Sequence, residues 1–183
     1  MSRYLVALGE GVKKRGVGTL HIVQSDGGAA DVQRAARLPV SPLLSGPAAG
    51  VHGAFEVSRQ AGFDRVITFD MGGTSTDVAL CDGSIPTRGD VVVGDFPART
   101  PVVDVYTVGA GGGSIARIDV GGALRVGPES AGADPGPACY GQGSAFTVTD
   151  AQALLGRLGA HGLLAGTMTL DIKRARTASA TLH

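Results

Sequence analysis

The chain has 183 residues, of which 16 are basic and 16 acidic, and the resulting zero net charge argues against nucleic acid as a partner. Apolar residues make up 43% of the sequence, which is enough for one continuous hydrophobic core. No apolar run approaches the roughly 20 residues of a membrane-spanning helix, and the first residues lack the order of a signal peptide. We therefore expect a cytoplasmic protein without a membrane partner.

Helical and strand patterns alternate along the first half of the chain. Leu5 and Leu8 repeat at the spacing of one helix face. Ser45 stands where it can cap a helix whose first turn holds Pro47, and Gly62 marks the end of that helix. The expected order is helix 3–15, strand 18–25, helix 29–37, helix 45–61, strand 65–70 and strand 77–83.

Shorter strands and one long loop follow in the second half. Two strands can pair across a turn at Gly121 and Gly122, and the last helix has Thr149 or Asp150 near its start. Because strands and helices alternate, the sequence predicts the α/β class. The expected order is an irregular hairpin 83–99, strand 101–109, strand 116–119, strand 123–128, loop 127–143 and helix 147–159.

The segment FDMGGTSTDVAL, residues 69–80, is the most informative for chemistry. Gly72 and Gly73 have no Cβ, so their amides can approach a polyphosphate closely, and they can adopt positive φ where the turn requires it. The three hydroxyl residues that follow can donate to phosphate oxygens. Asp70 stands at the strand end, where it can hold Mg²⁺ directly or through water. An ordinary hairpin with a glycine turn is the structural alternative.

The segment GAGGGS, residues 109–114, repeats the glycine theme after a strand. Its small residues would let a ligand lie against bare backbone. A dinucleotide-binding fingerprint fits poorly, because Ser114 occupies the place of its last glycine and the following residues favour a strand. A Walker A loop is excluded by the absence of Gly-Lys-Ser or Gly-Lys-Thr. A tight corner and a flexible joint stay open.

Two further features have less chemical content. The SGPAAG segment, residues 45–50, can offer helix N-terminal amides to an anion, but a close helix crossing made possible by small residues is the favoured interpretation. Cys81 and Cys139 form no CxxC pair and have no histidine at zinc-ligand spacing, so we expect reduced thiols. Cys139 also lacks a neighbouring base in the sequence, which favours a structural role.

Taken together, five segments resemble successive blocks of the hydantoinase A and 5-oxoprolinase family. That family includes ATP-dependent N-methylhydantoinases, 5-oxoprolinases and related subunits of acetone-type carboxylases. Its nucleotide domain is similar to those of actin, Hsp70 and sugar kinases. The resemblance therefore implies a ribonuclease-H-like mixed sheet with flanking helices, as one half of a two-subdomain ATPase. The five segments are 43–50, 69–80, 103–119, 121–141 and 147–158.

The resemblance also implies roles for individual residues. Residues 70–77 correspond to the second phosphate-binding hairpin, and residues 109–114 to the glycine segment near the adenosine and its phosphates. Asp70 would hold Mg²⁺, and Asp77, also a catalytic candidate, would orient the hairpin or polarise water, with the first role expected. The residues expected to contact ATP are Gly72, Gly73, Thr74, Ser75, Thr76, Gly109, Gly111, Gly112, Gly113 and Ser114.

Domain boundaries follow from the same resemblance. We expect residues 1–172 to form a partial hydantoinase A-type nucleotide-binding domain and residues 173–183 a truncated or disordered tail. The family's N-terminal domain, which carries another phosphate hairpin, is expected to be missing. A hydantoinase B-type subunit is the expected partner, and a homo-oligomer is also open. The isolated chain is therefore expected to be inactive.

The implied function is that of an ATP-binding module in a hydrolase of cyclic amides. Phosphate transfer to the ring carbonyl oxygen creates a leaving group and an activated carbon, after which water opens the ring. Positioning and charge neutralisation are the main tasks of the protein in such chemistry. Two alternatives stay open: a fragment of an acetone-type carboxylase, and a non-catalytic binding or assembly module that retains the fold. The sequence does not distinguish a hydantoin, 5-oxoproline or ketone substrate.

Overall fold

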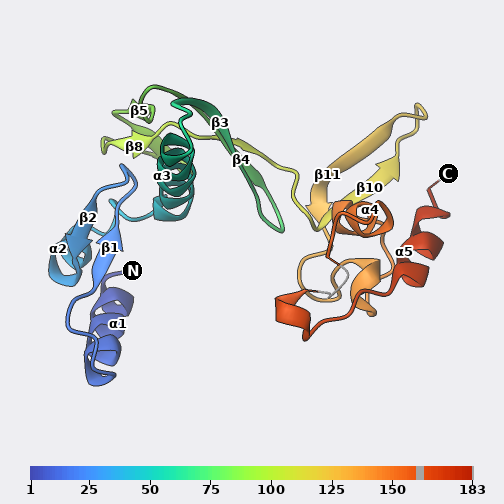
Figure 1. Cartoon of the computed structure of the whole chain (residues 1–183), viewed down its shortest axis with the longest axis horizontal. Coiled ribbons are helices and arrows are strands. Elements are labelled where there is room, and N and C mark those ends of the chain that lie inside the picture. The colour runs from blue at the N-terminus through green and yellow to red at the C-terminus, as the bar shows by residue number, and fades with distance from the viewer. Residues whose placement is uncertain (160–162, 183) are drawn as a thin grey trace. The chain divides into compact units, whose positions relative to one another are not determined.

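The computed structural model describes residues 1–159 and 163–182, and the chain divides into two compact units. The first unit comprises Met1–Asp70 and Asp77–Tyr106, and the second comprises Met71–Thr76 and Thr107–His183. One hairpin is therefore shared: its strands lie mainly in the first unit and its tip in the second. Figure 1 labels the elements that follow. The division falls inside the range 1–172, which the sequence suggested as one domain.

Two helices and a short hairpin form the N-terminal part of the first unit. Helix α1 (Ser2–Lys14) confirms the expected helix, and its Leu5 is buried. Strands β1 (His21–Val23) and β2 (Ala29–Asp31) pair antiparallel, so the expected helix 29–37 is wrong over its first three residues. Helix α2 (Val32–Arg37) begins only after Asp31, whose side chain accepts from the Arg34 amide at 2.8 Å.

Helix α3 (Ser45–Gln60) packs against the strands to form the core of the first unit. Ala48, Val51 and Phe55 of the helix contact Ala79 and Cys81 of the sheet. The predicted cap is wrong, because Ser45 is already the first helical residue and no side chain caps this end. The burial of Ala48 favours the packing interpretation of the SGPAAG segment over the anion-binding one.

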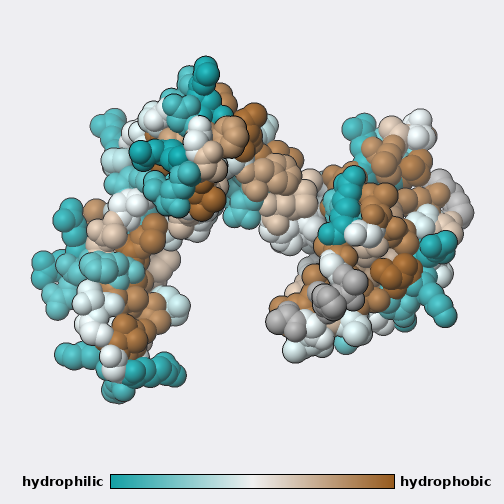
Figure 2. Space-filling model, in the orientation of Figure 1, coloured by the Kyte–Doolittle hydropathy of each residue, from teal (hydrophilic) through white to brown (hydrophobic). Residues whose placement is uncertain are grey.

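Strands β3 (Arg65–Met71), β4 (Thr76–Asp82) and β9 (Tyr106–Val108) form a three-stranded sheet in the order β3-β4-β9. Successive side chains of a strand point to opposite faces. Thr68 is accordingly buried, and its Oγ1 accepts a hydrogen bond from the Ala79 amide at 3.2 Å. On the other face, Ile67, Phe69 and Leu80 are 69%, 66% and 67% exposed. Figure 2 shows hydrophobic surface in this part of the first unit.

Short strands complete the first unit. The structure resolves the expected irregular hairpin into two-stranded antiparallel pairs, β5 with β8 and β6 with β7. The single strand expected over 101–109 is interrupted: Val102–Val103 pair with β5, whereas β9 joins the sheet of β3 and β4. The bounds are Thr87–Arg88 for β5, Val91–Val93 for β6, Phe96–Ala98 for β7 and Val102–Val103 for β8.

Over its described residues, the second unit contains the β10–β11 hairpin and four helical segments around a long loop. Strands β10 (Ser114–Ile118) and β11 (Leu124–Ser130) pair antiparallel, as expected, and Gly122 takes a positive φ of 79° in their turn. Helix α4 (Val148–Leu154) is capped by Thr147, which forms a capping box with Asp150. The short 3-10 helices are η1 (Ala138–Tyr140) and η2 (Leu164–Gly166).

The described residues of the C-terminal stretch, where the sequence suggested a truncated or disordered tail, include a helix. Helix α5 (Ile172–Ser179) is capped by Asp171, whose side chain accepts from the Arg174 amide at 3.0 Å. Ala175 packs with Cys139 and Ala153 in the core of the second unit. The packing of the Ala175 side of α5 against this core orders the helix.

The fold class is mixed α/β with small sheets, which confirms the predicted class at that level. Among the helices over residues 1–159 and 163–182, none combines the length and the apolar character that crossing a membrane requires.

Candidate functional site

The tip of the β3–β4 hairpin, residues 72–75, is a turn that leaves hydrogen-bond donors free. The Gly72 amide donates to the Ser75 carbonyl oxygen at 2.9 Å and closes the turn. Gly73 and Thr74 are exposed, and across the described residues neither their amides nor the Thr74 hydroxyl has a hydrogen-bond partner. The turn therefore presents donors on its outer side.

The chain's own geometry does not require glycine at either tip position. The turn makes no use of the positive φ that glycine allows, because neither Gly72 nor Gly73 has a left-handed backbone. A Cβ added to Gly73 would meet no atom within 4 Å, and one added to Gly72 would stand 3.5 Å from the Ser75 carbonyl oxygen, an ordinary contact. Gly73 therefore leaves open space beside its amide, which suits the close approach of a polyphosphate.

The glycine segment 109–114 packs on the tip through backbone groups. Gly112 donates its amide to the Gly72 carbonyl oxygen at 2.8 Å, and Gly113 donates to the Gly73 carbonyl oxygen at 2.7 Å. Two strands of backbone approach this closely only where side chains are absent. These two glycines therefore hold the tip on the side opposite to its free amide donors.

Glycine at position 111 is required by the same packing. An added Cβ would stand 2.7 Å from both the Gly72 carbonyl oxygen and the Ser75 amide nitrogen, closer than real side chains approach. The Gly111 amide donates to Ser114 Oγ at 2.8 Å, and both residues are buried. The amides of the expected ligand-contacting residues 111–114 are thus already engaged inside the protein. The segment therefore forms a tight corner, one of the two structural alternatives that the sequence left open.

The Thr76 hydroxyl holds the end of the hairpin tip. Thr76 is 4% exposed, and its Oγ1 donates to the Ala110 carbonyl oxygen at 2.6 Å. Of the three hydroxyl residues expected to contact ATP, Thr76 is therefore committed to holding the hairpin. Thr74 is exposed and Ser75 is half-buried, so these two stay candidates for contact with a ligand.

Asp70 and Asp77 line a cavity of about 200 Å³ in the first unit, between helix α3 and the strands. The wall on the helix side consists of small residues, among them Pro47 and Gly50. An added Cβ on Gly50 would stand only 3.2 Å from Asp70 Oδ2. Helix α3 therefore lets the Asp70 carboxylate lie close to its backbone because position 50 has no side chain.

The carboxylates at this cavity suit magnesium better than a metal ion that is held by protein side chains alone. No group of three or more His, Cys, Asp and Glu side chains within the described residues is arranged to hold a metal ion. Magnesium usually keeps water ligands and takes one or two carboxylates together with substrate phosphates. Asp70 has no ion pair or hydrogen bond within the described ranges, so its carboxylate is available to a cation.

Sequence reasoning missed Asp150 as the organiser of the second unit. Its carboxylate is fully buried and accepts hydrogen bonds from the Ala138 amide (3.2 Å), the Cys139 amide (2.7 Å) and both the amide (2.9 Å) and hydroxyl (2.8 Å) of Thr147. The capping-box spacing was visible in the sequence, but the bonds to 138 and 139 were not. Asp150 thereby ties the long loop to helix α4.

Cys139 is structural, as the sequence suggested. The thiol is buried, and burial together with the neighbouring Asp150 carboxylate raises its pKa to about 12. A thiol with so high a pKa holds its proton at neutral pH and is a poor nucleophile. Burial also raises the pKa of Cys81, in the core of the first unit. Both cysteines are free thiols.

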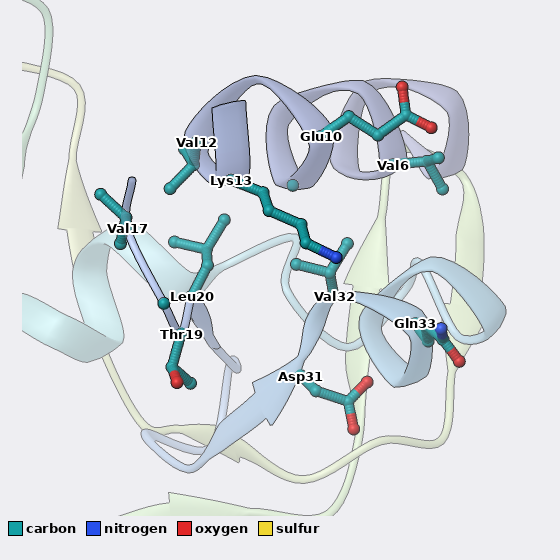
Figure 3. Close-up of a pocket in the computed structure, with 12 residues that line it drawn as sticks. Val6, Glu10, Val12, Lys13, Val17, Thr19, Leu20, Asp31, Val32 and Gln33 are labelled. Carbon is teal, nitrogen blue, oxygen red and sulfur yellow. The ribbon is translucent and has the colours of Figure 1, made fainter. Parts of the chain in front are cut away.

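A larger pocket lies away from every motif. Figure 3 shows this cavity of about 530 Å³ beside helix α1, with Val6, Val12, Leu20 and Val32 around it and the Lys13 side chain extending across it. None of the predicted site residues lines it. Its walls come from amphipathic elements whose sequence pattern indicates packing rather than chemistry. The hairpin tip of the second unit and the Asp70 cavity of the first unit are therefore the candidate places, one in each unit.

Comparisons with known proteins agree with the motif analysis. A sequence profile of the family described as Hydantoinase/oxoprolinase matches residues 1–183. The chain is 40% identical over 164 residues to the 5-oxoprolinase of Saccharomyces cerevisiae. The aligned region covers 86% of this chain and 12% of the yeast protein.

Two solved structures have the same fold as the chain. The ATP-dependent caprolactamase from Pseudomonas jessenii superposes with a TM-score of 0.78 at 39% identity, covering 99% of this chain and 27% of that one. A nucleotide-free structure of acetone carboxylase superposes with a TM-score of 0.78 at 30% identity, covering 97% and 25%. The chain thus spans about a quarter or less of the length of these relatives.

Proposed function

The chain belongs to the hydantoinase/oxoprolinase family, and on that premise we propose that it is the ATP-binding part of an ATP-dependent hydrolase of cyclic amides. The 5-oxoprolinase and caprolactamase names among its relatives support the substrate class. Caprolactamase and acetone carboxylase are both named as ATP-dependent, which supports the use of ATP.

The exposed amides of Gly73 and Thr74 are the observation that carries this proposal. Their nitrogens are free of partners within the described residues, and the space beside Gly73 is open. Successive amides that point to one side form an anion-binding concavity. The Thr74 and Ser75 hydroxyls add donors for phosphate oxygens. The glycine segment 109–114 has a different task in this proposal: it supports the tip from behind, and its Gly109 end is the part left for the nucleoside side.

Asp70 is the proposed magnesium ligand, and Asp77 orients the hairpin. When bound, Mg²⁺ neutralises the charge of the phosphate oxygens and so assists transfer of the terminal phosphoryl group. Asp70 precedes the tip by two residues and lines a cavity together with Asp77. Gly50 keeps that cavity wide enough for the Asp70 carboxylate. Asp77 is half-buried on the inner face of β4, which suits an orienting role.

The proposed reaction has two stages. The carbonyl oxygen of the cyclic amide attacks the terminal phosphorus of ATP, ADP leaves, and a phosphorylated imidate forms. Water then adds to the activated carbon, the carbon–nitrogen bond of the adduct breaks with proton transfer to the ring nitrogen, and an open-chain acyl phosphate forms. A second water hydrolyses this acyl phosphate to the carboxylate and inorganic phosphate. A ring amide is a weak electrophile, so the phosphoryl group supplies the leaving group that water needs. The residues of the tip contribute by positioning phosphate and balancing its charge.

We propose that the active form is larger than this chain. A ribonuclease-H-like ATPase of the actin type closes two subdomains around ATP, and the candidate site supplies donors from one of them. An N-terminal domain with another phosphate hairpin and a hydantoinase B-type subunit would complete the enzyme. The exposed apolar sheet face at Ile67, Phe69 and Leu80 supports this, because contiguous apolar surface marks a contact with another segment.

Nucleotide binding by a tip variant tests the proposal. Gly73→Val places a branched side chain in the space beside the free amides, and we expect it to abolish Mg·ATP binding by the complete enzyme in calorimetric titration. Gly53→Ala is the matched control, because an added Cβ there also meets no atom within 4 Å but lies on helix α3. Mg·ATP binding by Gly73→Val with the affinity of the unmodified enzyme would overturn the assignment.

The acetone carboxylase structure favours a second candidate function. In that case the same ATP site would activate a ketone and bicarbonate. The two functions differ in what stimulates ATP hydrolysis. A cyclic amide such as 5-oxoproline should stimulate the proposed hydrolase without bicarbonate, whereas ketone and bicarbonate together should stimulate a carboxylase.

A further inference from the structure

Thr149 holds the glycine segment by two hydrogen bonds to one atom. Its amide and its Oγ1 both donate to the Gly112 carbonyl oxygen, each at 2.8 Å. An added Cβ on Gly112 would stand 2.8 Å from Thr149 Oγ1, so the hydroxyl fills the space that the glycine leaves. Thr149 and Gly112 are thus fitted to one another both by hydrogen bonding and by shape.

Gly112 in turn holds the tip. Its amide donates to the Gly72 carbonyl oxygen at 2.8 Å, next to the 2.7 Å bond from Gly113 to Gly73. These are peptide units on the inner side of the turn whose outer side carries the free amides of Gly73 and Thr74. Because a peptide unit is planar, a rotation that changes the direction of a carbonyl also changes the direction of the amide that follows it.

Asp150 fixes Thr149 from the opposite side. It forms the capping box at the start of α4 and accepts from the amides of Ala138 and Cys139 in the long loop. The Cys139 carbonyl oxygen then accepts from the Asp171 amide at 2.8 Å, at the start of α5. Hydrogen bonds therefore connect α5 and the loop to Asp150, and Asp150 is joined by its peptide bond to Thr149, which bonds to the glycine segment.

We propose that Thr149 is a positioning residue that orients the tip amides for phosphate through Gly112. This inference rests on the proposed function of the tip. The hydroxyl keeps the Gly112 peptide in place, and the Gly112 amide keeps the Gly72 carbonyl in place. Loss of the hydroxyl leaves one bond to Gly112 instead of two, so the tip samples orientations that bind phosphate less well.

Two variants separate the hydroxyl from the bulk of the side chain. Thr149→Val retains the shape and removes the donor, and Thr149→Ser retains the donor. In the ligand-free chain, we expect Thr149→Val to speed hydrogen exchange of the Gly112 and Gly113 amides by about tenfold. Exchange of the Phe55 amide in α3 should not change. Thr149→Ala, which adds no bulk, gives the same measurement if the valine variant does not fold.

The functional measurement uses the complete enzyme. We expect Thr149→Val to raise KM for Mg·ATP by about tenfold, since a misoriented donor weakens phosphate binding, and to change kcat less than KM. Thr149→Ser should restore both exchange and KM. Unchanged exchange at Gly112 and Gly113 would overturn the role of Thr149 alone. Faster exchange without any change in the affinity for Mg·ATP would overturn the tip as the phosphate site and with it the proposed function.

Discussion

The Asp70 carboxylate lies against Gly50 of helix α3, where an added Cβ would stand 3.2 Å from Asp70 Oδ2. A contact of this kind forces a shift of a few tenths of an ångström in one partner. The Asp70 carboxylate and Asp77 line a small cavity, so the carboxylate can shift into that cavity. Gly50 thus connects the SGPAAG segment to the proposed magnesium ligand.

Gly50→Ala should raise the Mg²⁺ concentration that ATP hydrolysis requires, and the protein should still fold. The added methyl displaces the Asp70 carboxylate, so we expect ATP hydrolysis by the complete enzyme to need several-fold more Mg²⁺ for half-maximal rate. Gly53→Ala on the same helix is the control and should stabilise the protein by up to about 1 kcal/mol through helix propensity, with no change in Mg²⁺ dependence. Equal Mg²⁺ curves for both variants would count against Asp70 as the ligand.

Gly111→Ala should destabilise the second unit. Its methyl would meet the Gly72 and Ser75 backbone at 2.7 Å, and backbone yields less than a flexible side chain. We expect a loss of about 1–3 kcal/mol in the free energy of unfolding, measured with urea. Gly109→Ala in the same segment meets no atom within 4 Å and should change stability by less than about 0.5 kcal/mol. The prediction fails if the two variants unfold at the same urea concentration.

The Cys139 thiol should make stability fall at alkaline pH. Burial and the Asp150 carboxylate raise its folded pKa to about 12, from an ordinary value of 9.0. Between these two values the unfolded chain has lost the thiol proton and the folded chain retains it. The unfolded state therefore binds fewer protons, and the stability contribution is complete below pH 9 and is lost as pH rises toward 12.

The measurement compares the unmodified chain with Cys139→Ala, because tyrosines and lysines also titrate in this range. The difference in the free energy of unfolding between the two should shrink as pH rises above 9. Iodoacetamide should also label Cys139 much faster in urea than in the native protein. Rapid native labelling of Cys139 at pH 8 would contradict the buried, protonated thiol.

Asp150→Asn should destabilise the chain far more than a surface change of the same kind. The side-chain amide offers donors where the Ala138, Cys139 and Thr147 amides need acceptors, and an unsatisfied buried donor costs about 1–3 kcal/mol. We expect a loss of at least about 2 kcal/mol in urea unfolding. Asp95→Asn, in an exposed turn, is the control and should be nearly neutral. Similar unfolding midpoints would show that Asp150 does not organise the loop.

Local patterns predicted the hairpins well. The β3–β4 and β10–β11 pairs each bring together residues that are close in sequence, so a glycine turn between two apolar runs was sufficient. The helix 147–159 was expected with Thr149 or Asp150 near its start, whereas the residue that caps α4 is Thr147, paired with Asp150 in a capping box. The Ser45 cap was a wrong prediction, since the turn of residues 38–44 runs directly into α3 and leaves Leu44 at the cap position.

Long-range packing was beyond the sequence. Gly111 to Gly113 looked like a ligand surface, but the close neighbours there belong to the protein itself. The backbone of the hairpin tip, about 40 residues earlier in the chain, stands close to Gly111 and Gly113, and Thr149 Oγ1 stands close to Gly112. Asp150 likewise binds amides 11 and 12 residues away, which no local pattern announces. Conversely, packing in the fold does not require glycine at positions 72, 73 and 109, and only the structure separates these glycines from Gly111, Gly112 and Gly113.

The position of bound phosphate tests the central claim most directly. A structure of the complete enzyme with Mg²⁺ and a non-hydrolysable ATP analogue should place a phosphate oxygen within about 3 Å of the Gly73 and Thr74 amide nitrogens. Phosphate bound elsewhere, with both amides facing solvent, would contradict the account.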